Sequence, residues 1–257
     1  QPGCRITAGE IVFDGVDLVK LSDQEKRKFW GNRMTYVAQS AAASFNPAHR
    51  LITQTTASTI RAGLKDRTAA FEDAKHLYKV LNLPDPNNIG DRYPHQVSGG
   101  QLQRVMTAMA MSPRPDLLVF DEPTTALDVT TQVEVLASMR AIVEEFNTAA
   151  IYITHDLAVV AQMADVIKVL RYGEEVEEAS TRQMLSDPKQ PYTKSLWSVR
   201  ALQKPEQPLH PSVLSLTGID ASYGQQKVLH NVNIDVPRGS TVAVVGESGC
   251  GKSTTAR

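Results

Sequence analysis

The chain has 257 residues, of which 42% are hydrophobic and 21% are charged, with a formal net charge of −1. This balance is typical of a globular protein with a sizeable core, and it argues against electrostatic binding to nucleic acid or anionic lipid. No apolar run approaches the roughly 20 residues that a membrane-spanning helix needs. Two cysteines, Cys4 and Cys250, are too few for a disulfide framework or a cysteine metal cluster.

Strands and helices alternate along the first two hundred residues. Apolar runs predict strands at 10–15, 34–38, 117–120, 149–154 and 166–170, and helical apolar spacing predicts helices at 22–30, 53–82, from 97 onward, 130–146 and 192–202. Because the longer strands are almost entirely apolar, we expect a parallel sheet that is covered by helices on both faces. Such sheets bind ligands beyond the carboxyl ends of their strands, and polar candidates follow three of the predicted strands.

The last part of the chain has a different character. Three prolines within 204–212 predict a linker. Alternating residues over 213–222 and 228–236, around a turn at 224–226, then predict a β-hairpin. A β-branched run at 240–245 predicts a buried strand.

A glycine-rich stretch follows that strand, and it fits the phosphate-loop pattern G-x-x-x-x-G-K-[ST]. Its glycines permit a tight turn whose N–H groups face phosphate oxygens, at the start of a helix. Lys252 brings a positive charge to the outer phosphates, and the Ser253 hydroxyl can bind Mg²⁺. A plain glycine turn before an ordinary helix is the alternative, which the complete motif disfavours. The predicted ATP-binding residues here are Gly246, Ser248, Gly249, Cys250, Gly251, Lys252, Ser253 and Thr254.

An acidic pair, Asp121 and Glu122, directly follows an apolar strand. Asp121 can hold Mg²⁺ through its carboxylate, and Glu122 can accept a proton from an attacking water as a general base. Taken alone, the pair fits the acidic start of a helix equally well. Ser98 and the two glycines after it could form an anion site at a helix N-terminus, with an ordinary N-cap as the competing interpretation.

These motifs occur together, and the whole set resembles the ATP-binding subunit of an ABC transporter. The resemblance covers nearly the whole chain, and the combination is far more specific than any one motif. It implies an α/β fold of the P-loop NTPase class. Such a fold has a mostly parallel sheet flanked by helices, an antiparallel β subdomain and a helical signature subdomain.

The resemblance also implies roles for residues that carry little signal alone. His155 would contact the γ-phosphate and orient the attacking water, and Gln39 would reach both Mg²⁺ and that water. Asp128 would couple two sites, and Tyr223 would stack on adenine. The signature residues Ser98, Gly99, Gly100 and Gln101 would cap the γ-phosphate held by an opposite cassette. The expected catalytic residues are Glu122, His155, Gln39 and Lys252, and the expected Mg²⁺ ligands are Ser253, Gln39 and Asp121.

Three further stretches, 91–96, 124–130 and 191–195, resemble importers of dipeptides, oligopeptides, nickel or glutathione. This resemblance implies an ATPase on the cytoplasmic face of the inner membrane, with permease subunits and a second cassette as partners. An extracytoplasmic substrate-binding protein would be an indirect partner. Two departures from the family pattern are Val97 before the signature and the small-residue run after Gln39, and the latter leaves the membrane partner open.

Two other functions carry similar motifs. One is a soluble ABC-type ATPase in translation or DNA repair, which the subfamily stretches and the lack of a basic patch disfavour. The other is a nucleotide-binding module that does not hydrolyse ATP, which the intact Glu122 and His155 disfavour.

The motifs stand in an unusual order. In the family, the adenine aromatic residue and the phosphate loop precede the other motifs, but here they follow them. We therefore predict that 1–203 is a first cassette without its phosphate loop, that 204–212 is a linker, and that 213–257 begins a second cassette. The alternative is a permuted cassette in which 213–257 folds back onto 1–203.

In the tandem arrangement Lys252 and Glu122 would serve different sites, whereas in a permuted cassette they would share one. Because a strand at 240–245 needs a parallel sheet to bury both faces, we expect the isolated chain to pack in the permuted way. The helix after Lys252 is cut short, so we expect these 257 residues alone to hydrolyse ATP weakly or not at all.

Overall fold

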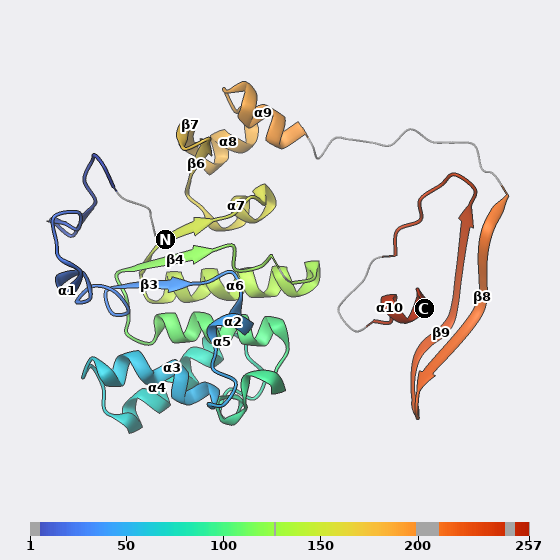
Figure 1. The fold of residues 1–257 in the computed structure, drawn as a ribbon, viewed down its shortest axis with the longest axis horizontal. Coiled ribbons are helices and arrows are strands. Elements are labelled where there is room, and N and C mark those ends of the chain that lie inside the picture. Colours follow the sequence, from blue (N-terminus) through green and yellow to red (C-terminus); the bar gives the residue numbers. More distant parts are fainter. Residues whose placement is uncertain (1–5, 126, 199–210, 245–249, 257) are drawn as a thin grey trace.

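The computed structural model describes residues 6–125, 127–198, 211–244 and 250–256 (Figure 1). Its centre is a parallel sheet in the order β3–β4–β5. The strands are β3 (Met34–Val37), β4 (Leu117–Asp121) and β5 (Ala149–Ile153). The register aligns Val37, Phe120 and Tyr152, so the carboxyl ends of the strands meet at one edge. The predicted parallel sheet is confirmed for these strands.

One face of this sheet carries the hydrophobic core. The helices α5 (Gly99–Met111) and α6 (Val129–Glu145) pack on it, and α3 (Leu51–Arg61) and α4 (Arg67–Val80) pack against α5. The apolar face of α5 is buried in this core. Fully buried members of the core include Leu77, Tyr78, Val105, Met106, Leu118, Phe120, Met139 and Ile142.

The predicted helical stretch 53–82 consists of two helices rather than one. α3 ends before Ala62, and Gly63 has a left-handed backbone with φ of 69°. Asp66 then caps α4 by accepting a hydrogen bond from the amide of Ala69. The break lets α3 and α4 pack side by side against α5, which a single straight helix could not do.

The opposite face of the sheet lacks a helical cover among the described residues, so the prediction of two covered faces is wrong there. The register places Tyr36, Val119 and Ile151 in one row on this face. Tyr36 is 54% exposed and Ile151 is 49% exposed, although both side chains are large and apolar over most of their surface. The cause is that α5 and α6 both lie on the other face.

Short elements surround this body. Near the N-terminus are β1 (Val12–Phe13), β2 (Val16–Asp17) and α1 (Asp23–Lys26), which begins with a capping box between Ser22 and Glu25. Next come α2 (Ala41–Ser44), η1 (Ile89–Asp91) and η2 (Pro94–Gln96). After the sheet follow α7 (Leu157–Met163), β6 (Val166–Arg171), β7 (Glu174–Ser180), α8 (Thr181–Ser186) and α9 (Pro191–Ser198).

The C-terminal part forms the predicted hairpin, made of β8 (Ser212–Tyr223) and β9 (Gln226–Pro237), with the one-turn helix α10 (Lys252–Thr255) against β9. Residues 204–210 of the predicted linker lie outside the described residues. The strand predicted at 240–245 is wrong over 240–244, which have no regular structure and are exposed. A parallel strand forms only beside another strand. Figure 1 shows this segment apart from the β3–β4–β5 sheet, so it has no such neighbour there.

Within the described ranges, no helix has both the length and the apolarity that crossing a bilayer requires.

Candidate functional site

Residues that follow the ends of three neighbouring strands meet at the side chain of Glu122. Glu122 directly follows β4, Gln39 lies just beyond β3, and His155 lies just beyond β5. The Nε2 atom of Gln39 donates a hydrogen bond to Oε2 of Glu122 over 3.2 Å. The Nδ1 atom of His155 lies 2.9 Å from Oε1 of Glu122, within ion-pair distance. The structure therefore brings together three of the predicted catalytic residues, which are far apart in the sequence.

Thr125 also contacts this carboxylate, although no role was expected for it from the sequence. Its Oγ1 atom donates to Oε2 of Glu122 over 3.0 Å and lies 3.2 Å from the backbone oxygen of Glu122. The signal that could have identified it is its position three residues after Glu122, in a turn where a hydroxyl reaches back along the chain.

The backbone of Glu122 is also unusual. Its φ angle is 45°, in the left-handed region that costs energy for residues other than glycine and, to a lesser degree, Asn and Asp. Its amide donates to the carbonyl oxygen of Ile153 in β5 over 2.9 Å. This bond fixes the turn between β4 and the next segment, and with it the position of the carboxylate.

Glu122 and His155 shift each other's pKa. The hydrogen bond from His155 lowers the pKa of Glu122 below its ordinary 4.5, and the hydroxyl of Thr125 lowers it further. The same carboxylate raises the pKa of His155 above 6.5. Glu122 is thus ionised at neutral pH and able to accept a proton, while the side chain of His155, which is 72% exposed, remains accessible to a substrate.

Asp121 lies one residue before this cluster, at the end of β4. The hydroxyl of Tyr36 donates to its Oδ2 atom, and this hydrogen bond raises the pKa of Tyr36. Its carboxylate and the amide oxygen of Gln39 are hard oxygen donors of the kind that Mg²⁺ takes, so the residues fit that ion chemically. No group of three or more His, Cys, Asp or Glu that could hold a metal ion occurs among the described residues.

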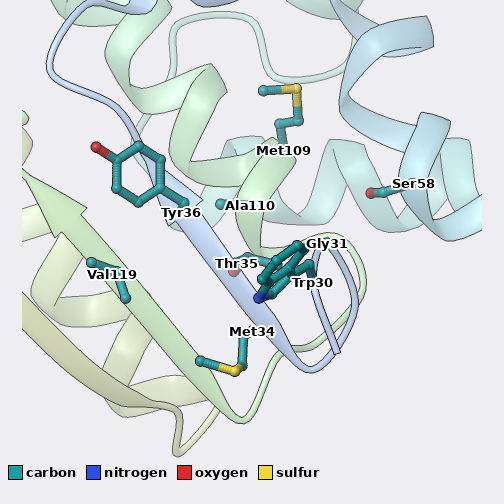
Figure 2. Close-up of a pocket in the computed structure, with 9 residues that line it drawn as sticks. All are labelled: Trp30, Gly31, Met34, Thr35, Tyr36, Ser58, Met109, Ala110 and Val119. Atoms are coloured by element: carbon teal, nitrogen blue, oxygen red, sulfur yellow. The ribbon is translucent and has the colours of Figure 1, made fainter. Parts of the chain in front are cut away.

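Tyr36 also lines an apolar hollow (Figure 2). This hollow has a volume of about 540 Å³ and is lined by Trp30, Met34, Tyr36, Met109 and Val119, among others. Its apolar lining distinguishes it from the polar cluster at Glu122, so we assign it no part in the chemistry.

The signature residues begin helix α5. The Oγ atom of Ser98 accepts from the amide of Gln101 over 3.3 Å, and Oε1 of Gln101 accepts from the amide of Ser98 over 3.1 Å, which completes a capping box. Gly99 is exposed, but Gly100 is buried against α6, where an added Cβ would overlap the Cγ2 methyl of Thr131. The glycine at position 100 is therefore needed for the close approach of two helices.

Asp128 lies at the start of α6, next to the same contact. Its Oδ1 atom accepts from the amide of Thr131 over 3.1 Å, and its Oδ2 atom accepts from the Thr131 hydroxyl over 3.0 Å. Thr131 thus joins the signature glycine to the predicted coupling aspartate. Through Thr131, the signature motif at the start of α5 is in contact with Asp128 at the start of α6.

The phosphate loop is described in part. Gly246, Ser248 and Gly249 lie outside the described residues. Gly251 has φ of 95° and begins α10, where an added Cβ would lie 2.7 Å from the Cδ2 atom of Leu229 in β9. The Nζ atom of Lys252 lies 3.6 Å from the Sγ atom of Cys250. Ser253 and Thr254 follow on the same helix.

The structure does not bring α10, which begins with Lys252, to the strand ends around Glu122. Figure 1 shows α10 beside β9 and apart from the ends of β4 and β5. Tyr223 ends β8 and is exposed, again on the C-terminal hairpin. The expectation that 213–257 folds back to complete 1–203 within one chain is therefore wrong for this structure. The short α10 keeps its contact with β9 and makes none of the main contacts of the sheet.

Comparison with known proteins identifies the family. The family model described as ABC transporter matches residues 2–125 and 229–257. The glutathione import ATP-binding protein GsiA of Pectobacterium atrosepticum is 34% identical over 99% of this chain and 48% of its own length. A probable peptide ABC transporter ATP-binding protein, y4tR of Sinorhizobium fredii, is 37% identical over 75% of this chain and 57% of its own length. The chain spans about half the length of these curated relatives.

A solved structure supports the fold. The dimeric, post-hydrolysis structure of the ATP-binding cassette MJ0796, bound to ADP and Pi, matches with a TM-score of 0.60 at 26% identity. The match covers 68% of this chain and 75% of that one. The predicted P-loop NTPase fold is thereby confirmed. Since the family model matches more than half of its residues, this chain belongs to the ABC transporter family.

Proposed function

We propose that this chain contributes an ATP-hydrolysing site to a transporter that imports glutathione or small peptides. The observation that carries the proposal is the convergence of Gln39, Thr125 and His155 on the carboxylate of Glu122. The relatives support the substrate class, because one is named for glutathione import and another for peptide transport.

The proposed chemistry follows from this geometry. A water that attacks the terminal phosphate of ATP loses a proton, and the ionised carboxylate of Glu122 is the base that accepts it. The three contacts hold that carboxylate in one orientation, so little reorganisation is needed at the moment of reaction. His155, mostly exposed and with a raised pKa, is placed to donate a hydrogen bond to the phosphate.

Mg²⁺ would be held by Asp121 and Gln39 at the site of the first cassette, whereas Ser253, on the phosphate loop of the second cassette, would hold the ion of the other site. When bound, the ion would neutralise charge on the phosphate oxygens. The role of Asp121 is thus to fix a cation, whereas the role of Glu122 is to accept a proton.

We further propose that the site residues of this chain belong to two different cassettes. Residues 1–203 supply Gln39, Ser98, Asp121, Glu122 and His155, whereas 213–257 supply the phosphate loop and Tyr223 of a second cassette. The separate placement of α10 and β5 supports this division. The partners would be two permease subunits, with a substrate-binding protein on the far side, and the cassettes would lie on the cytoplasmic face of the inner membrane.

The test uses the chain within its full-length protein, co-purified with its permease and reconstituted in vesicles. Glu122→Gln should reduce ATP hydrolysis by at least about a hundredfold, as expected for the loss of a general base, and uptake of a labelled tripeptide or glutathione should stop. Glu144→Gln is the matched control, because Glu144 makes an exposed ion pair with Arg140. Hydrolysis that survives Glu122→Gln would refute the assignment, and failure to recover a permease would refute the transport role.

A further inference from the structure

A tyrosine in β3 reaches the carboxylate at the end of β4. The hydroxyl of Tyr36 donates a hydrogen bond to the Oδ2 atom of Asp121, the last residue of that strand. The register explains how they meet. Tyr36 pairs with Val119, and Asp121 lies two residues further along β4, on the same face of the sheet. The two residues are 85 positions apart in the sequence, so the contact depends on the parallel pairing of β3 with β4.

The length of the tyrosine side chain suits this diagonal contact. Side chains in a strand stand out from the sheet and lean along the strand, so a long one can reach the next residue on the same face of the neighbouring strand. Phenylalanine has the same ring but lacks the donor. Figure 2 shows the hydroxyl of Tyr36 turned away from Trp30 and Met34 in the apolar hollow. The hydroxyl is therefore directed to Asp121 rather than into the hollow.

The exposure of Tyr36 argues against a role in packing. More than half of its surface is exposed, whereas the adjacent Val37 is fully buried on the other face of the sheet. Stabilisation by apolar burial grows with the area removed from water, so this large ring gains little of it here. The hydrogen bond to Asp121 is the interaction that favours a tyrosine over an aliphatic residue at this position.

The hydrogen bond also restrains the Asp121 carboxylate. It engages Oδ2, which leaves Oδ1 able to bind a cation. The last torsion of an aspartate side chain is broad, so a donor fixed to one oxygen narrows the directions that the other oxygen can take. Hydrogen-bond partners of this kind orient metal-binding carboxylates, and their loss typically weakens metal binding by about 10- to 100-fold.

We propose that Tyr36 is a positioning residue that orients the Asp121 carboxylate for Mg²⁺. The inference rests on the function proposed above, in which Asp121 holds that ion. Mg²⁺ demands near-ideal octahedral geometry, whereas Ca²⁺ binds in flexible arrangements of oxygens. A carboxylate held in one orientation therefore favours Mg²⁺ over Ca²⁺, and a carboxylate that rotates freely loses most of that preference. Tyr36 thus contributes to the choice of the ion as well as to its affinity.

Metal binding to the full-length protein tests the proposal without turnover. The protein is loaded with a stoichiometric amount of a non-hydrolysable ATP analogue. Titration with Mn²⁺, followed by electron paramagnetic resonance, and competition with Mg²⁺ and with Ca²⁺ then give the three affinities. Tyr36→Phe keeps the ring and removes the donor, so the Mg²⁺ affinity should fall at least about tenfold and the Ca²⁺ affinity should fall less. The site that Ser253 would serve is unaltered and gives a constant background.

Two controls show whether the effect is specific to this hydroxyl. Tyr152→Phe removes a hydroxyl from β5, where Tyr152 packs beside Phe120 against the hydrophobic core, and it should leave the Mg²⁺ and Ca²⁺ affinities unchanged. Nucleotide binding in EDTA, measured with a fluorescent ATP analogue, should be equal in Tyr36→Phe and the unmodified protein. Equal binding shows that the nucleotide site remains folded.

Asp121→Asn separates this inference from the function on which it rests. It removes the charge, so it should weaken the binding of Mg²⁺ and Ca²⁺ alike. If Asp121→Asn does so while Tyr36→Phe changes neither affinity, or lowers both equally, Tyr36 does not position the carboxylate and the proposed function stands. If Asp121→Asn has no effect on either ion, the proposed metal site is wrong and the role of Tyr36 falls with it.

Discussion

The Nδ1 atom of His155 lies 2.9 Å from the Oε1 atom of Glu122, and the two side chains meet across the ends of neighbouring strands. The contact lowers the pKa of Glu122 and raises that of His155. The attraction between the charges is therefore present above the lowered pKa of Glu122 and below the raised pKa of His155. It is lost as the pH falls through the first value, and again as the pH rises through the second.

The first prediction concerns this pair. Glu122→Gln removes the charge that raises the pKa of His155, so that pKa should fall towards 6.5. The measurement is an NMR titration of the imidazole protons of His155. Thr125→Val is the control, because it removes a hydroxyl from Glu122 and leaves the histidine contact in place, so the pKa of His155 should stay raised. An equal fall in both variants would show that the ion pair is not the cause.

The second prediction concerns the closest approach of α5 and α6. Gly100→Ala would drive a Cβ into the methyl group of Thr131, and overpacking of this kind costs about 1–3 kcal/mol of unfolding free energy. Urea denaturation measures the loss. Gly99→Ala is the matched control, since its Cβ would lie 3.8 Å from Leu127, and it should be neutral or slightly stabilising.

A rescue separates this clash from other effects of alanine. Thr131→Ser removes the obstructing methyl and keeps the hydroxyl that donates to Asp128. The double variant with Gly100→Ala should regain most of the lost stability. If the double variant does not regain stability, Gly100 is needed for its backbone conformation rather than for the packing of α5 against α6.

The third prediction concerns the capping boxes at Ser98 and Ser22. Ser98→Ala should lower the unfolding free energy by about 1 kcal/mol, because the amide of Gln101 at the start of α5 loses its acceptor. Ser22→Ala removes the same kind of cap from α1, which has four residues and buries none of them, so its effect should be smaller. Thermal unfolding of both variants beside Ser98→Thr, which keeps an acceptor, tests the difference. Equal losses at the two sites would contradict it.

The fourth prediction concerns the chain in isolation. Because Lys252 lies in α10 and Glu122 directly follows β4, on separate parts of the structure, purified chain should release little phosphate from ATP. The measurement is a phosphate-release assay with Mg²⁺ at several protein concentrations. Turnover that is rapid, and that Glu122→Gln abolishes, would show that these residues form a complete site by themselves.

Local patterns in the sequence were enough to predict the three strands of the parallel sheet and the C-terminal hairpin. They also placed Gln39, Glu122 and His155 at one edge, because parallel strands align their carboxyl ends. Each of these inferences depends on neighbours within a few residues, or on a rule about how strands are arranged.

The errors concern contacts between distant parts of the chain. The run at 240–245 has the pattern of a buried strand. A strand also needs a partner strand, and whether one is available cannot be predicted from the residues of the run alone. The contacts of Thr125 with Glu122 and of Tyr36 with Asp121 depend on backbone angles and on strand register. Neither could be read from residue type alone.

The left-handed backbone at position 122 is occupied by a glutamate, a residue type poorly suited to it. Asparagine or glycine would adopt a φ of 45° at lower cost, and strain of this kind is worth of order 1–3 kcal/mol. A design procedure that rewarded only stability would replace Glu122, and would thereby remove the carboxylate that we propose as the general base. Under that proposal, this position gives up durability in exchange for chemistry.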